Sequence, residues 1–135
     1  LAKSSTCFGA FSGDACIGFC AVMHFPHATN SHWRVHRVVV LPDWQGVGVG
    51  MLLLAAVGSL YRAVGRELRM PAMHPPLIRS LDKSCDWAMT KRPGQFTRVN
   101  RSRSSGTGAM GGRPTAVFRY VGQAADPAVA RSLLA

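Results

Sequence analysis

The sequence predicts an α+β fold, with a hairpin and further strands beside a central helix that follows a glycine-rich turn. Three observations lead to this prediction. The chain opens with two strand-like runs, continues with a β-branched strand that ends near alternating glycines, and then enters a long stretch with helical apolar spacing. With 135 residues, of which 47% are hydrophobic, the chain has the length of one domain with a core of its own.

The first predicted elements are a hairpin and a strand. Apolar runs at residues 6–11 and 15–25 flank a short turn around Gly13, which is typical of a hairpin. The run WRVHRVVVL at residues 33–41 is the strongest strand of the chain, because it is rich in β-branched residues. Pro42 ends it, since proline cannot donate to a sheet ladder.

A helix, a short strand and a second helix are expected next. Apolar residues recur near helical spacing over residues 49–64, and Gly65 stands where a helix C-terminus often has a glycine. Residues 67–73 form a short strand despite a proline. The second helix is predicted over residues 75–83, with proline in its first turn.

The last third of the chain predicts a strand pair, separated by a loop, and a short helix. The strands are residues 86–91 and 115–122, and the segment between them is rich in Gly, Ser and Arg. Asp126 and the following proline predict the start of the short helix. We therefore expect a single domain over residues 1–122, with a flexible basic loop at 92–113, and a tail or short helix at 123–135.

The glycines after the strongest strand fit neither common nucleotide motif. A Walker loop needs a lysine after its last glycine, whereas Met51 follows Gly50. The dinucleotide fingerprint needs Gly-x-Gly-x-x-Gly, and Gly46, Gly48 and Gly50 have a different spacing. What remains is a strand, a turn with exposed amides and a helix N-terminus, which together suit a phosphate. The alternative is a tight strand-to-helix turn that binds no ligand.

This segment resembles a known family. Pro42 followed by Gln45-x-x-Gly48-x-Gly50 and a long apolar helix is similar to the acetyl-CoA-binding core of the GNAT N-acetyltransferases, whose signature is Arg/Gln-x-x-Gly-x-Gly/Ala. The resemblance covers roughly residues 8–121 and is most specific over residues 37–60. It implies a GNAT-like fold with a mixed, mostly antiparallel sheet, acetyl-CoA as the cosubstrate and transfer of an acetyl group to an amine, with no metal.

The resemblance also implies which residues hold the cofactor. The strand would pair with the pantetheine arm and the turn amides would hold the pyrophosphate, with the Arg37 and Gln45 side chains near the phosphates. Glycines fit there because a side chain would block the approach. The implied cofactor-binding residues are Val38, Val39, Val40, Gln45, Gly46, Val47, Gly48, Val49 and Gly50.

The sequence departs from the family pattern at three places. The first strand and the N-terminal helices of the family are missing, so a homodimer partner or a larger-protein context would have to supply that part of the site, unless it is lost. Leu81 stands where many members have a tyrosine that protonates the thiolate. His74 replaces an asparagine near the start of the second helix.

Two histidines are candidates for the general base that the attack of an amine on a thioester requires. His36 lies on the strand before the turn, and alternation places it on one face with Arg34, Val38 and Val40. A structural histidine in the strand layer is the alternative. His74 is the second candidate, and a residue that only begins a helix is the alternative.

The charge of the chain is uneven. The 16 basic residues outnumber the six acidic ones, and residues 91–119 contain seven basic residues and no acidic one. Such a segment attracts polyanions, and nucleic acid could bind through Arg98, Arg101 and Arg103. A solvated loop without a partner is the alternative. Beside an acetyltransferase, two further classes thus stay open: a GNAT-fold enzyme that modifies or binds nucleic acid, and a non-catalytic acyl-CoA-binding module.

The start of the chain and the cysteines indicate where the protein is expected to reside. No signal peptide pattern is present at the start, and no stretch is long enough to span a membrane comfortably. Cys16 and Cys20 lie roughly 13 Å apart along an extended strand, too far for a disulfide. Reduced, buried thiols are therefore expected, which favours the cytoplasm.

Overall fold

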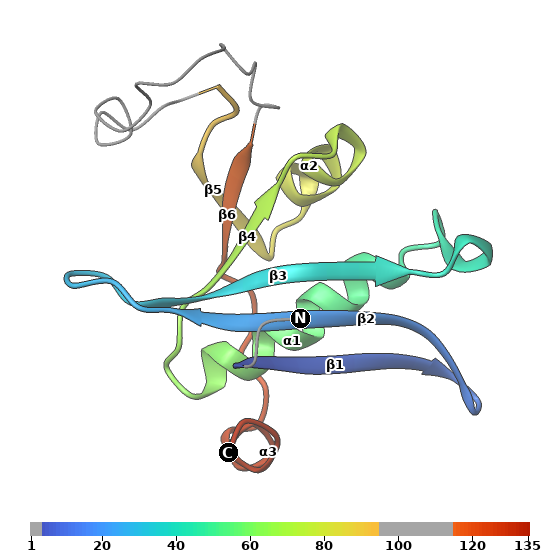
Figure 1. The fold of residues 1–135 in the computed structure, drawn as a ribbon, viewed down its shortest axis with the longest axis horizontal. Coiled ribbons are helices and arrows are strands. Elements are labelled where there is room, and N and C mark those ends of the chain that lie inside the picture. Colours follow the sequence, from blue (N-terminus) through green and yellow to red (C-terminus); the bar gives the residue numbers. More distant parts are fainter. Residues whose placement is uncertain (1–3, 95–114) are drawn as a thin grey trace.

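The protein has one six-stranded sheet, and Figure 1 shows its arrangement. The computed structural model describes residues 4–94 and 115–135. Neighbouring strands follow the order β1-β2-β3-β4-β6-β5. Every neighbouring pair is antiparallel except β3 and β4, which are parallel. The predicted α+β class and the mostly antiparallel sheet are therefore confirmed.

The predicted hairpin and the strand after it form one half of the sheet. Strands β1 (Ser5–Ser12) and β2 (Ala15–Phe25) are joined by a turn in which Gly13 has a φ of 59°. Strand β3 (His32–Val40) pairs with β2, and a single turn of 3₁₀ helix, η1 (Pro42–Trp44), follows it.

The central helix α1 (Val49–Ala63) ends within one residue of the predicted position. Gly65 adopts a φ of 71°, its amide donates to the Arg62 carbonyl at 3.0 Å, and the Arg66 amide donates to the Tyr61 carbonyl at 2.9 Å. These two bonds define a Schellman motif, which satisfies carbonyls at the helix end. The predicted C-terminal glycine is confirmed.

The remaining elements complete the sheet and its covering helices. Strand β4 (Leu68–Ala72) and helix α2 (Pro75–Lys83) lie where the sequence predicts them. Strands β5 (Trp87–Lys91) and β6 (Ala116–Tyr120) form the predicted pair, with β6 inserted between β4 and β5. In the last helix, α3 (Pro127–Leu133), the Asp126 carboxylate accepts from the Ala128 amide at 2.7 Å and so caps the N-terminus.

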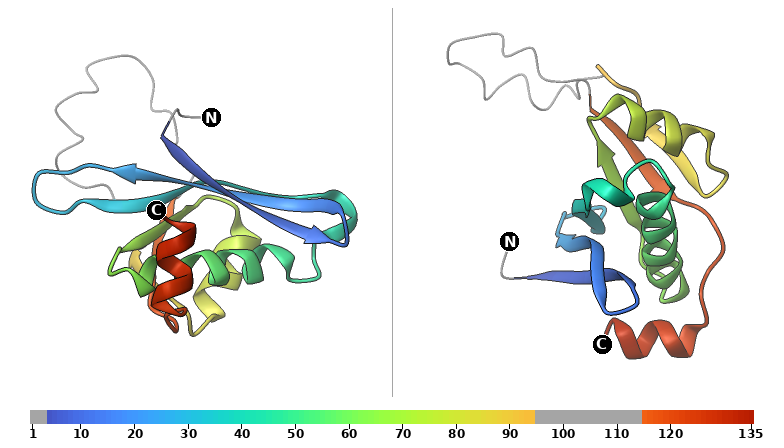
Figure 2. Two further views of the ribbon diagram at one scale, coloured as in Figure 1. Left: turned by 90° about the horizontal axis from the view of Figure 1, so that it is seen from below. Right: turned by 90° about the vertical axis from the view of Figure 1, so that its right-hand side faces the viewer.

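The hydrophobic core lies between α1 and the sheet. Tyr61 and Leu54 of α1 are at most 1% exposed, and Phe118 of β6 is fully buried. Helices α1 and α3 lie on the same side of the β1–β3 layer in Figure 2, and Ala130 of α3 is fully buried. Within the described ranges, no helix covers the opposite face of β1–β3.

Strands β3 and β4 pair over a short distance and then separate. The pairs are Trp33 with Leu68 and Arg34 with Arg69, beside a bond from the Trp33 amide to the Glu67 carbonyl at 2.9 Å. Alternate residues of a strand direct their backbone groups to the same neighbour, so Pro71 falls on the β3 side. Because proline has no amide proton, it cannot continue the ladder there. The separation leaves the edge of β3 beyond Arg34 without a β4 partner.

Some predictions fall outside the described residues, and the prediction for the cysteines is partly wrong. Arg98, Arg101 and Arg103, and the predicted basic loop from residue 95 onward, lie outside the described residues. The four cysteines are unpaired, but the prediction of buried thiols is wrong for three of them, because only Cys20 is buried. In the described residues, no helix combines the length and the apolar character needed to cross a bilayer.

Candidate functional site

A cleft of about 590 Å³ lies where β3, the glycine turn, α1 and α2 meet. Strand β3 contributes one wall, the turn and the first residues of α1 form the end, and the start of α2 forms the other wall. The divergence of β3 and β4 opens this space. The lining residues are Val38, Val40, Trp44, Gln45, Gly46, Gly48, Val49, Gly50, Met51, Leu54, His74, Pro76, Leu77 and Ser80.

The turn places backbone amides at the N-terminus of α1. Gly46 and Gly48 have φ values of 81° and 92°, a left-handed region that side chains rarely occupy. Gly48 is the N-cap residue, and the Leu52 amide donates to its carbonyl at 3.0 Å as the helical ladder begins. The first amides of a helix have no partner within the helix and carry the positive end of its dipole. The site therefore suits an anionic group such as a phosphate.

Gln45 fixes the turn to the end of the strand. Its side-chain amide donates to the Val40 carbonyl at 2.8 Å. The Gln45 amide also donates to the Pro42 carbonyl at 3.2 Å, which closes η1. The side chain is thus engaged with the protein itself, and its role is to orient the turn.

Seven of the nine predicted cofactor-binding residues line the cleft, and two do not. Val39 and Val47 are absent from the lining, with side chains 39% and 68% exposed. The apolar lining residues that α1 and α2 contribute, such as Met51 and Leu77, were not predicted from the sequence. Their positions depend on the packing of α2 beside the turn, which no local pattern reveals.

A β-bulge in β3 changes which side chains share a face. Ala21 pairs with Arg37 and Val22 pairs with Val35, so His36 is an additional residue opposite β2. After the bulge, Val38 pairs with the buried Cys20 and packs against the core. The prediction that His36 shares a face with Val38 and Val40 is therefore wrong. Alternation holds only while the pairing register is continuous.

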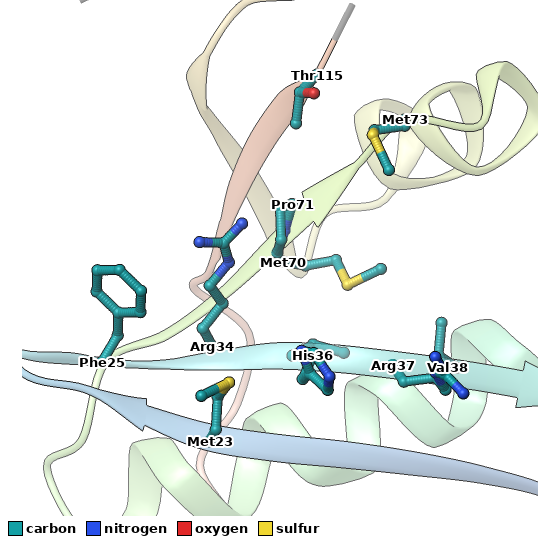
Figure 3. A pocket seen from close by; sticks show the side chains of 11 residues that line it. Met23, Phe25, Arg34, His36, Arg37, Val38, Met70, Pro71, Met73 and Thr115 are labelled. Atoms are coloured by element: carbon teal, nitrogen blue, oxygen red, sulfur yellow. The ribbon is translucent and has the colours of Figure 1, made fainter. Parts of the chain in front are cut away.

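His36 instead lines a second pocket, of about 430 Å³, together with Arg34 and Arg37 (Figure 3). This pocket lies between the β2–β3 pair and the diverging end of β4. Its further lining residues are Met23, Phe25, Val35, Val38, Met70, Pro71, Met73 and Thr115. Val38 lines both the cleft and this pocket. The two spaces thus approach each other at Val38, and Arg37 belongs to the second pocket rather than to the phosphate end of the cleft.

The other candidate residues occupy different environments. His74 is the N-cap residue of α2 and lines the cleft, and its carbonyl accepts from the Ile78 amide at 3.0 Å. Leu81 is fully buried in the core, so it presents no side chain to the cleft. No group of three His, Cys, Asp or Glu side chains in the part of the chain that the structure describes is arranged to hold a metal ion.

The fold and the sequence both match known acetyltransferases. The family model described as "Acetyltransferase (GNAT) domain" matches residues 3–82. The chain therefore belongs to the GNAT acetyltransferase family. No curated protein matches the chain.

Solved structures with the same fold share little sequence with the chain. An acetyltransferase of the GNAT family from Desulfovibrio desulfuricans has 21% identity and a TM-score of 0.62, with 87% of this chain and 69% of that chain covered. A Bacillus subtilis acetyltransferase in complex with CoA has 15% identity, a TM-score of 0.63, and coverages of 88% and 78%. Arabidopsis thaliana Naa50, in complex with the bisubstrate analogue CoA-Ac-MVNAL, has 16% identity, a TM-score of 0.54, and coverages of 86% and 72%.

Proposed function

We propose that the protein transfers an acetyl group from acetyl-CoA to an amine. The observation that carries this proposal is the cleft between β3 and α2, closed at one end by the glycine turn and the N-terminus of α1. CoA bound to the B. subtilis relative and the CoA-containing analogue bound to Naa50 support the choice of ligand.

The pyrophosphate would bind at the amides of residues 46–50. Gly46 and Gly48 leave these amides open, since a Cβ at either position would have no heavy atom within 4 Å and would project into the space that the ligand needs. The dipole of α1 favours the negative charge. This arrangement needs no metal to hold the phosphates.

The pantetheine arm would lie along the free edge of β3. Val38 and Val40 pair with β2 on one side, while β4 has already separated from β3 on the other. An extended ligand with amide groups can add to such an edge as a strand does. The thioester at the end of the arm would then come to lie near Val38, where the cleft and the second pocket approach each other.

The reaction requires one proton acceptor. The amine nitrogen attacks the thioester carbon, a C–N bond forms, the C–S bond breaks, and the amine loses a proton. We assign this proton to His36, directly or through a water molecule, because His36 lines the pocket on the far side of Val38 from the cofactor cleft. The CoA thiolate leaves and takes a proton from solvent. His74, on the wall of the cofactor cleft, is the second candidate.

The assay is the release of free CoA from acetyl-CoA in the presence of a panel of amines, with CoA binding measured separately by calorimetry. His36→Ala should lower kcat by ~10²–10⁴-fold, the usual effect of losing a general base. Its Kd for CoA should stay unchanged, since His36 does not line the cleft. His74→Ala is the comparison variant. An unchanged rate in His36→Ala would move the assignment to His74 or to water, and absent CoA binding by the wild type would refute the proposed function.

A further inference from the structure

The second pocket carries a concentration of positive charge without a matching negative one. Arg34 and Arg37 line it beside His36, whereas none of the six acidic residues of the chain does. Those acidic residues are Asp14, Asp43, Glu67, Asp82, Asp86 and Asp126, all within the described ranges. The pocket lining therefore contains two arginines and no acidic side chain, so a bound anion could supply the negative charge.

The acidic residue just before β4, Glu67, is already paired with an arginine other than Arg34. Arg34 lies beside Arg69 in the parallel register of β3 and β4. The Arg69 guanidinium binds the Glu67 carboxylate at 2.5 Å, in the one ion pair found among the described residues. Glu67 is thus engaged with Arg69, and the charged residue that pairs with Arg34 across the strands is a second cation rather than an acid.

The Arg34 side chain packs against an aromatic ring, and among the described residues its guanidinium forms no ion pair with a carboxylate. It is half-buried, and its guanidinium carbon lies 5.6 Å from the centroid of the Phe25 ring. Figure 3 shows the side chain extending from β3 toward the part of the pocket where Pro71 and Thr115 lie. Stacking on an aromatic face positions the planar fork of an arginine and leaves its N–H groups able to bind an oxyanion.

Apart from Thr115, the rest of the pocket lining is apolar. Met23 of β2, Met70 of β4 and Met73 after β4 provide flexible thioether side chains, which adapt to ligands of irregular shape. A ligand that fits this pocket therefore combines an anionic group with an apolar portion. Simple polyamines and lysine-rich segments have the wrong charge for it.

We propose that the acetyl acceptor is an amine that also carries an oxyanion, a carboxylate or a phosphate, held by Arg34 and Arg37, with its apolar portion against the methionines. This inference rests on the proposed function, because it treats the second pocket as the acceptor side of an acetyltransferase. The same charges assist the chemistry. Two nearby cations lower the pKa of a bound ammonium group, which favours the neutral amine that attacks.

The test compares amines in matched pairs, of which one member carries the oxyanion and the other does not. L-leucine is compared with L-leucinamide, and O-phosphoethanolamine with ethanolamine, by CoA release; the pair with the larger difference distinguishes carboxylate from phosphate. We expect at least one anionic member to exceed its neutral counterpart by about tenfold or more in kcat/KM, since hydrogen bonds to charged groups have that worth. Arg34→Gln and Arg37→Gln should each remove most of that preference by raising KM.

The control arginine is Arg79, which is exposed on α2 and lines neither the cleft nor the second pocket. Arg79→Gln should keep the preference, and the Kd for CoA should be the same in all three variants. Neutral amines used as well as their anionic counterparts by the wild type would overturn the inference while leaving the acetyltransferase proposal intact.

A binding measurement covers the case in which none of these amines is turned over. With CoA at saturation, calorimetry compares N-acetyl-L-leucine with N-acetyl-L-leucinamide, which mimic charged and neutral products. Binding of the charged compound that Arg34→Gln abolishes supports the inference. Equal binding of both compounds, or binding of neither, contradicts it. CoA binding by the same samples shows separately whether the proposed cofactor site is intact.

Discussion

Replacing Gly48 with valine separates the two demands that the glycine turn meets. Gly48 has a φ of 92° and a ψ of 1°, a conformation that a β-branched residue adopts only with strain. Gly48 also lines the cleft, so the substitution adds a side chain at the site proposed for the pyrophosphate. We therefore expect both a less stable fold and a weaker complex with CoA.

The magnitudes follow from the geometry. Strain of this kind costs roughly 1–3 kcal/mol. For a domain of this size each kcal/mol lowers Tm by roughly 3–5 °C, so the expected decrease in Tm is about 3–15 °C. Losing one hydrogen bond to a charged phosphate weakens binding by about 1.5–3 kcal/mol, or roughly 10- to 150-fold in Kd.

Gly65→Val is the matched control. Gly65 has a φ of 71° and, like Gly48, has no heavy atom within 4 Å of a Cβ built on it, but it lies at the opposite end of α1 from the cleft. Both variants should lose stability in thermal unfolding, and only Gly48→Val should lose CoA affinity in calorimetry at a temperature where both are folded. Equal CoA affinity of the two variants would refute the assignment of the turn as the pyrophosphate site.

Two further predictions concern the core. Burial, followed by the influence of Cys7, raises the pKa of Cys20 to about 12, so its thiol stays protonated and unreactive at pH 8. A thiol reagent should therefore modify Cys7, Cys16 and Cys85 in the native protein, and Cys20 only after unfolding. Four reactive thiols in the folded protein would contradict the buried position of Cys20. A Cβ on Gly58 would lie 2.4 Å from the Tyr120 ring, so Gly58→Ala should destabilise the fold by about 1–3 kcal/mol. Denaturant unfolding measures this loss, and the Kd for CoA should not change. An unchanged unfolding midpoint would show that β6 does not pack closely on α1.

Elements whose signals are local could be predicted from the amino-acid sequence. Gly65 ends α1 because a left-handed residue closes the helix, and Asp126 begins α3 because its carboxylate accepts a helix amide. The order of strands and helices, and the turn at Gly48, follow from the same short-range preferences. These preferences act within a few residues, so they can be recognised without knowing what lies across the sheet.

The way in which those elements combine into a site depends on pairing and packing between distant segments. The bulge at His36 is a mismatch in length between β3 and β2, so the alternation of β3 alone gave the wrong face for Val38 and Val40. The insertion of β6 between β4 and β5, and the divergence of β3 and β4 at Pro71, depend on which strands pair over long sequence separations. The same pairing brings Arg34 and the Met70 side chain to one pocket, since contacts between distant segments arise from register and packing rather than from the preference of any single residue.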